Sequence, residues 1–157
     1  MRINLVKPFL AILAVGLILA ANVSAEEVLV PNPKLTPGRV ARTEKERSGV
    51  TLKLEQKVFA RYRLPWARRA EFKIDHLIPL ELGGADTLDN LWPQSFRAKP
   101  YGADRKELLT EVLLEQIRTG RMTLAQTQEE IRKDWIDAFI DHVGMVYLKG
   151  GLTPATD

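Results

Sequence analysis

Residues 72–94 read FKIDHLIPLELGGADTLDNLWPQ. Residues 72–79 show an alternation of apolar and polar side chains and contain Ile74, Leu77 and Ile78, which predicts a strand. Gly83 and Gly84 supply a turn with permissive backbone angles, and a second strand is predicted over residues 89–94. A helix is predicted over residues 104–119, because apolar residues recur there at helical spacing and Gly120 fits its C-terminal stop. The order strand, loop, strand, helix predicts an α+β domain.

Two further helices are expected on either side of this stretch. Leu54, Val58 and Tyr62 recur every four positions, so an amphipathic helix is predicted from Thr51 to a point before Pro65. Thr123 with Gln126 forms a capping box for one last helix. The apolar face of that helix comprises Ile131, Trp135, Ala138, Phe139 and Val143. The prolines at 31, 33 and 37 predict an extended segment over residues 26–50.

The first residues carry the pattern of a secretory signal peptide. Arg2 and Lys7 precede an uncharged stretch over residues 9–21, and Val23-Ser24-Ala25 resembles a signal-peptidase site. We therefore expect cleavage after Ala25 and export to the periplasm or the medium; an uncleaved membrane anchor is the alternative. The expected divisions are signal peptide 1–25, extended segment 26–50, main domain 51–148 and tail 149–157.

The formal net charge of +3 conceals an asymmetry along the chain. Residues 34–73 contain twelve Lys and Arg against four Glu, a local charge of +8. Residues 74–157 contain nine basic and fourteen acidic residues, a local charge of −5. A basic first half is typical of a surface for a polyanion, although charged residues also coat ordinary solvent-facing helices. The chain has no cysteine, which excludes disulfides and zinc sites built on thiolates.

His76 is the first candidate for chemistry because of its neighbours. The chain has only two histidines, His76 and His142, so a multi-histidine metal cluster is excluded. His142 is expected to be a solvated or half-buried helix residue. Asp75 precedes His76 at a predicted strand end, where a carboxylate can hold a hard cation and an imidazole can deprotonate water. That pair suits phosphodiester hydrolysis, although an isolated Asp-His pair is weak support by itself.

The run from Ile74 to Asp86, followed by Asn90-Leu91-Trp92-Pro93-Gln94, resembles the core of HNH endonucleases. It is similar to exported bacterial members whose motif reads DH-x-x-P-L-x-x-G-G followed by NLWP. The resemblance implies a ββα-metal core within the α+β domain. It also implies that His76 is the general base, that Asp75 is a metal ligand, and that Asn90 braces the loop that orients the histidine. Lys106-Glu107 resembles the Lys-Asp of the family.

The third motif position is where this sequence departs from the family. Counting back from Lys106-Glu107, that position falls near Asp104, where histidine or asparagine is usual. Aspartate can still bind a hard cation, so Asp104 is expected to be the second metal ligand. Asp104 also stands at a predicted helix start with Glu107 three residues later, so it could be an N-cap instead. Asn90 has a structural alternative as well, because asparagine is common in turns.

These expectations combine into a metal-dependent endonuclease acting on DNA, with RNA as a second substrate class. The cofactor is a divalent cation, Mg²⁺ first and Mn²⁺ as an alternative, with no small-molecule cofactor and no stable membrane association after cleavage. Trp66 is expected to be a core residue, with stacking on bases as the alternative. Rival functions are a non-catalytic nucleic-acid-binding module and a periplasmic partner-binding protein. Phosphate contacts are expected from Lys53, Lys57, Arg61, Arg63, Arg68 and Arg69.

Overall fold

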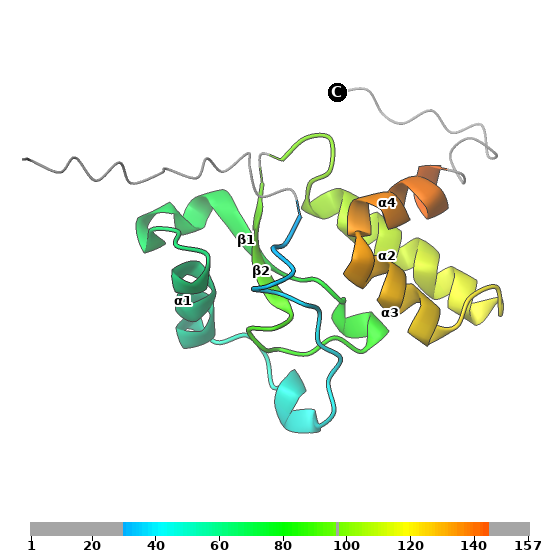
Figure 1. The fold of residues 1–157 in the computed structure, drawn as a ribbon, viewed down its shortest axis with the longest axis horizontal. Coiled ribbons are helices and arrows are strands. Elements are labelled where there is room, and N and C mark those ends of the chain that lie inside the picture. The colour runs from blue at the N-terminus through cyan, green and yellow to red at the C-terminus, as the bar shows by residue number, and fades with distance from the viewer. Residues whose placement is uncertain (1–29, 97, 145–157) are drawn as a thin grey trace, which may run out of the picture.

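The computed structural model describes residues 30–96 and 98–144. These residues form an α+β domain with one two-stranded antiparallel sheet and four α-helices (Figure 1). No helix within them has the length and apolar character needed to cross a membrane. The predicted signal peptide, residues 1–25, and the predicted tail, residues 149–157, lie outside the described residues.

The sheet is formed by β1 (Phe72–His76) and β2 (Leu91–Ser95), close to the predicted positions. Asp75 pairs with Trp92, and His76 pairs with Leu91 at the end of the sheet. The first strand is shorter than the predicted residues 72–79. Pro79 has no N–H to donate, and the chain turns into a short 3-10 helix at Leu80–Leu82. Asp75 and His76 therefore stand at the last two positions of the strand.

Helices cover both sides of this sheet. The helix α1 (Leu52–Arg61) lies on one side, and α2 (Ala103–Arg118), α3 (Leu124–Lys133) and α4 (Trp135–Phe139) gather on the other (Figure 1). Every residue of β2 is buried, because the strand is covered on both faces. The core contains Phe59, Phe72, Leu77, Ile78, Leu82, Trp92, Leu109, Leu113, Ile131 and Trp135. Trp66 packs edge-on against Phe59 at 5.1 Å between ring centroids, as a core residue would.

The last helix is interrupted, which corrects the prediction of a single continuous helix. Thr123 and Gln126 form the predicted capping box of α3. Asp134 then adopts an extended conformation, and its carboxylate accepts hydrogen bonds from the backbone N–H groups of Ile136 and Asp137. An aspartate whose side chain caps new N–H groups starts a new helix, so α4 begins at Trp135. A π-helical turn follows at Ile140–Gly144. The predicted apolar face survives this break, because all of its residues remain buried.

The segment before α1 is more ordered than an extended chain. Its residues 30–50 include a 3-10 helix at Glu44–Arg47 and a β-bridge between Val40 and Gly84. Thr36 is fully buried, and its hydroxyl donates a hydrogen bond to the Leu91 carbonyl. The prolines alone predicted an extended segment, whereas these contacts with β2 and with the loop between the strands fix its course. Residues 38–49 therefore lie along the loop between the two strands.

Candidate active site

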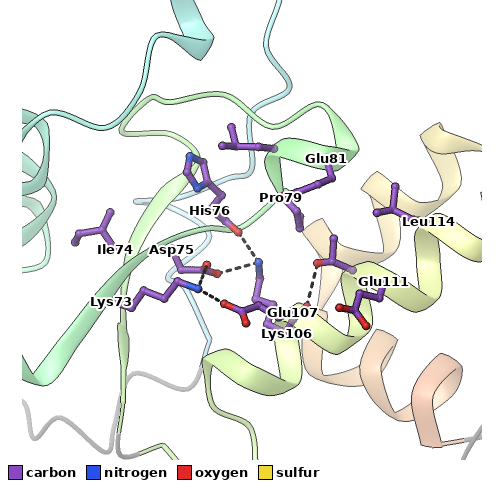
Figure 2. Close-up of a pocket in the computed structure, with 12 residues that line it drawn as sticks. Lys73, Ile74, Asp75, His76, Pro79, Glu81, Lys106, Glu107, Glu111 and Leu114 are labelled. Carbon is purple, nitrogen blue, oxygen red and sulfur yellow. Dashed lines mark hydrogen bonds and ion pairs between the residues drawn. The ribbon is translucent and has the colours of Figure 1, made fainter.

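Asp75 and His76 line a cavity of about 500 Å³ between the end of β1 and the first turns of α2. The two side chains leave the strand in different directions, as neighbouring strand residues do. Figure 2 shows the imidazole of His76 turned away from the Asp75 carboxylate, while the backbone carbonyl of His76 faces Lys106. The strand end thus presents a carboxylate and an imidazole at different parts of one cavity.

Lys106 is the closest charged partner of Asp75. Its Nζ lies 2.9 Å from Oδ2 of Asp75 and donates a hydrogen bond to the His76 carbonyl. Lys106 lies in the first turn of α2 and is buried, and a buried ammonium needs such partners. The Lys106 ammonium forms an ion pair with Asp75 but is not oriented to donate a hydrogen bond to it. Oδ2 of Asp75 is therefore a buried carboxylate oxygen that accepts no hydrogen bond. Lys106 therefore joins α2 to the end of β1.

A second lysine and a glutamate complete the charged wall of the cavity. Lys73 Nζ donates a hydrogen bond to Glu107 and lies 3.9 Å from Oδ1 of Asp75. Burial of Lys73 opposes its charge, but the hydrogen bond to Glu107 and the charges of Asp75, Glu107 and Glu81 outweigh it and raise the pKa. Lys73 thus stays protonated over the physiological range. The wall combines two ammonium groups with several carboxylates (Figure 2).

His76 has an acidic partner that the sequence did not single out. Its Nε2 lies 2.8 Å from Oδ1 of Asp86, whose side chain is only 3% exposed. The other carboxylate oxygen of Asp86 accepts a hydrogen bond from the Gly49 N–H at 2.7 Å. The backbone N–H of Asp86 donates to the Glu46 carbonyl at 2.6 Å. Asp86 lies within the quoted motif, but nothing in the sequence indicated that residues 46–49 would contact it.

Asn90 lies where a bracing residue would lie. It is fully buried, and its Oδ1 accepts a hydrogen bond from the Ile78 N–H at 2.9 Å. Its Nδ2 donates to the carbonyls of Ile78 at 2.9 Å and Ala85 at 3.0 Å, and its own carbonyl accepts from the Leu77 N–H. Asn90 therefore ties the turn after His76 to the residue before Asp86. It does not line the cavity.

The structure does not bring Asp104 to this cavity. Its side chain is 78% exposed and lies 3.8 Å from Arg105, its neighbour in the chain. Gly102 is the N-cap of α2, and the helix start has no side-chain cap, so the capping alternative for Asp104 is wrong. The predicted ligand role of Asp104 stays a prediction. Glu107 and Glu111, one and two turns along from this position, line the cavity instead.

None of the six predicted phosphate-binding residues lines the cavity. Lys53, Lys57, Arg63 and Arg69 are exposed, with Arg69 stacked over the Trp66 ring. The other two are half-buried and already paired: Arg61 with Asp89, and Arg68 with Glu71. The helix α1 lies across the sheet from α2, so a nucleic acid contacting both would have to cross the end of the sheet (Figure 1).

The donor chemistry of the cavity fits a hard divalent cation. Mg²⁺ is usually held by one or two carboxylates together with several water molecules. The buried Asp75 Oδ2 and the cavity-lining Glu107 provide such a pair. Within residues 30–96 and 98–144, no group of three His, Cys, Asp or Glu side chains is positioned to hold a metal ion. A cation at Asp75 would therefore depend on water for most of its ligands and would compete with Lys106.

Comparisons with known proteins give no relative: no family model, no curated protein and no solved structure matches this chain.

Proposed function

We propose that the protein is a metal-dependent endonuclease with a ββα-metal core that hydrolyses phosphodiester bonds in DNA. One observation carries the proposal: His76, Asp75 and the Lys106–Glu107 pair of α2 border a single cavity at the end of a two-stranded sheet. The same four residues belong to the stretches that resemble HNH endonucleases. RNA remains a second substrate class, since phosphate contacts do not depend on the sugar.

The chain's own residues supply most of the proposed mechanism. The neutral imidazole of His76 takes a proton from water, and the hydroxide forms a P–O bond as the bond to the leaving sugar oxygen breaks. That oxygen takes a proton from solvent. The protonated Lys73 offsets negative charge on the phosphate. Asp75 and Glu107 would hold a divalent cation, which supplies Lewis-acid stabilisation of charge on the phosphate when bound.

A second candidate is a non-catalytic module that binds nucleic acid. The ion pair between Asp75 and the buried Lys106 favours it, because this contact neutralises the proposed ligand without a cation. In that case Lys73 and the exposed basic residues of the first half would bind phosphate and no bond would break. The two candidates share a partner and differ in chemistry.

Cleavage of supercoiled plasmid by the mature chain, with Mg²⁺ or Mn²⁺ and with chelator, tests the proposal. We expect cation-dependent nicking in the wild type. Loss of the general base in His76→Ala should reduce the rate by a factor on the order of 10²–10⁴. His142→Ala is the matched control, because His142 contacts Gln116 and Glu130 away from the cavity. Full activity in His76→Ala would refute the mechanism, and DNA binding without nicking would favour the module.

A further inference from the structure

We propose that Asp86 is the positioning residue for His76: its carboxylate holds the imidazole in the tautomer that carries its proton on Nε2 and leaves Nδ1 free as the base. This inference rests on the proposed function for its catalytic consequence. Its structural content, the tautomer, stands independently of any activity.

The hydrogen bond between the two side chains carries the inference. His76 Nε2 and Asp86 Oδ1 are 2.8 Å apart, and an ionised carboxylate only accepts hydrogen bonds. Nε2 must therefore carry the proton that is shared with Asp86. Among the residues that the structure describes, no hydrogen-bond partner occupies Nδ1, and His76 lines the cavity. In the neutral ring, Nδ1 is consequently the unprotonated nitrogen that can accept a proton from water.

Asp86 is itself held in place, which a residue that orients another side chain requires. Its Oδ2 accepts the Gly49 N–H at 2.7 Å, and its backbone N–H bonds to the Glu46 carbonyl at 2.6 Å. The preceding carbonyl, that of Ala85, accepts a hydrogen bond from Asn90. These contacts come from two segments far apart in the chain, residues 46–49 and residue 90. They fix the carboxylate on both sides, so the imidazole can rotate only by breaking its bond to Oδ1.

The Gly49 contact makes an amide at position 86 diagnostic. In Asp86→Asn, one side-chain atom becomes an NH₂ donor, and the Gly49 N–H can bond only to the remaining oxygen. The NH₂ group then faces Nε2 of His76 and requires that nitrogen to accept. The Gly49 N–H can only donate, whereas the His76 ring can change its tautomer. The imidazole proton therefore moves to Nδ1, and Nδ1 can no longer accept a proton from water.

The test compares Asp86→Asn and Asp86→Ala with wild type in the mature chain. Long-range ¹H–¹⁵N correlation spectra report the tautomer of His76. Plasmid cleavage under saturating cation gives kcat and KM. We expect Nε2–H in the wild type and Nδ1–H in Asp86→Asn, with kcat reduced by a factor on the order of 10²–10⁴ and KM little changed.

The order of the two variants separates positioning from simple stability. Asp86→Ala removes the acceptor but presents no donor to Nε2, so it should retain more activity than Asp86→Asn. A merely structural role predicts the reverse, because Asn keeps the shape and one hydrogen bond of the native residue. Glu130→Gln is the matched control, since it makes the same change beside His142 Nε2, and it should leave cleavage unchanged.

The outcomes also separate this inference from the proposed nuclease function. An unaltered Nε2–H tautomer in Asp86→Asn, or wild-type kcat in that variant, overturns the positioning role. A wild type that cleaves no nucleic acid but changes tautomer in Asp86→Asn overturns the nuclease and supports the positioning. Asn more active than Ala overturns the positioning role as well.

Discussion

At the scale of single residues, Asn90 shows how one side chain can organise a site without touching its cavity. It bonds to three backbone groups of the turn that connects His76 to Asp86, all of them buried. The resemblance to HNH endonucleases predicted a bracing residue here, and the contacts are those of a brace. These hydrogen bonds contribute to the stability of the turn independently of the proposed function.

Asn90→Ala should destabilise the fold by about 3 kcal/mol or more. Each buried backbone group left without a hydrogen-bond partner costs about 1–3 kcal/mol. This change removes the partner of three such groups, the N–H and carbonyl of Ile78 and the carbonyl of Ala85. Urea denaturation followed by circular dichroism measures the difference. Asn32→Ala is the control, because the side chain of Asn32 is exposed and bonds to the nearby Lys34 N–H. A loss of stability as small as that of the control would mean that water forms hydrogen bonds with these backbone groups in place of Asn90.

The choice of cation ligand is also a question about single residues. Glu107→Ala should lower the cleavage rate and raise the Mg²⁺ concentration for half-maximal activity, because the cavity then has one carboxylate fewer. Asp104→Ala should leave that concentration unchanged, since its carboxylate lies outside the cavity. Lys73→Ala breaks the same ion pair and keeps the Glu107 carboxylate, so it should lower the rate without raising the Mg²⁺ concentration for half-maximal activity. A raised requirement in Asp104→Ala alone would support the ligand role that the resemblance implies.

At the scale of elements, the two strands of the motif and the helix after it could be predicted from the sequence. Apolar spacing and turn residues are local signals, and they mark these elements directly. The break at Asp134 could not, because apolar periodicity continues through it and only the cap geometry marks a new helix. The 3-10 helix at Glu44–Arg47 and the Asp86 contacts to residues 46–49 were missed for a related reason. They depend on which segment folds against the loop between the strands. The local spacing of residues does not indicate such contacts between distant segments.

The Gly83-Gly84 turn gives a prediction at this scale. A Cβ on Gly84 would lie 1.8 Å from the Ile78 carbonyl oxygen and 2.8 Å from Asn90 Nδ2, so the turn must move in Gly84→Ala. We expect destabilisation beyond the roughly 1–3 kcal/mol typical of overpacking, together with reduced cleavage. Gly120→Ala is the control. It has a positive φ of 71° but open space, so it should cost about 1–2 kcal/mol and spare activity. Equal melting temperatures for the two variants would contradict this explanation of the turn.

At the scale of the whole molecule, the division of charge along the chain becomes a division in space. The basic half includes α1 and residues 38–49, which lie along the loop between the strands, whereas the acidic half includes α2, α3 and α4 on the other side of the sheet (Figure 1). The sequence predicted a polyanion-binding surface in the first half, but not which of its cations are already paired. Arg61 and Arg68 are paired with carboxylates, so the exposed Lys53 and Lys57 on α1 are better placed for phosphate.

Lys53→Gln with Lys57→Gln should therefore weaken DNA binding for every sequence tested. Each phosphate interaction that the two changes remove should reduce the slope of log affinity against log salt by about 0.9, because fewer counterions are released from the DNA. Fluorescence anisotropy with a labelled duplex, over a range of salt concentrations, measures that slope. Arg118→Gln with Arg121→Gln removes the same charge from the end of α2 and the turn after it, and should leave the slope unchanged. If both double variants reduce the slope equally, the net charge of the molecule governs binding and α1 is not its surface. If only the control does, the nucleic acid runs along α2.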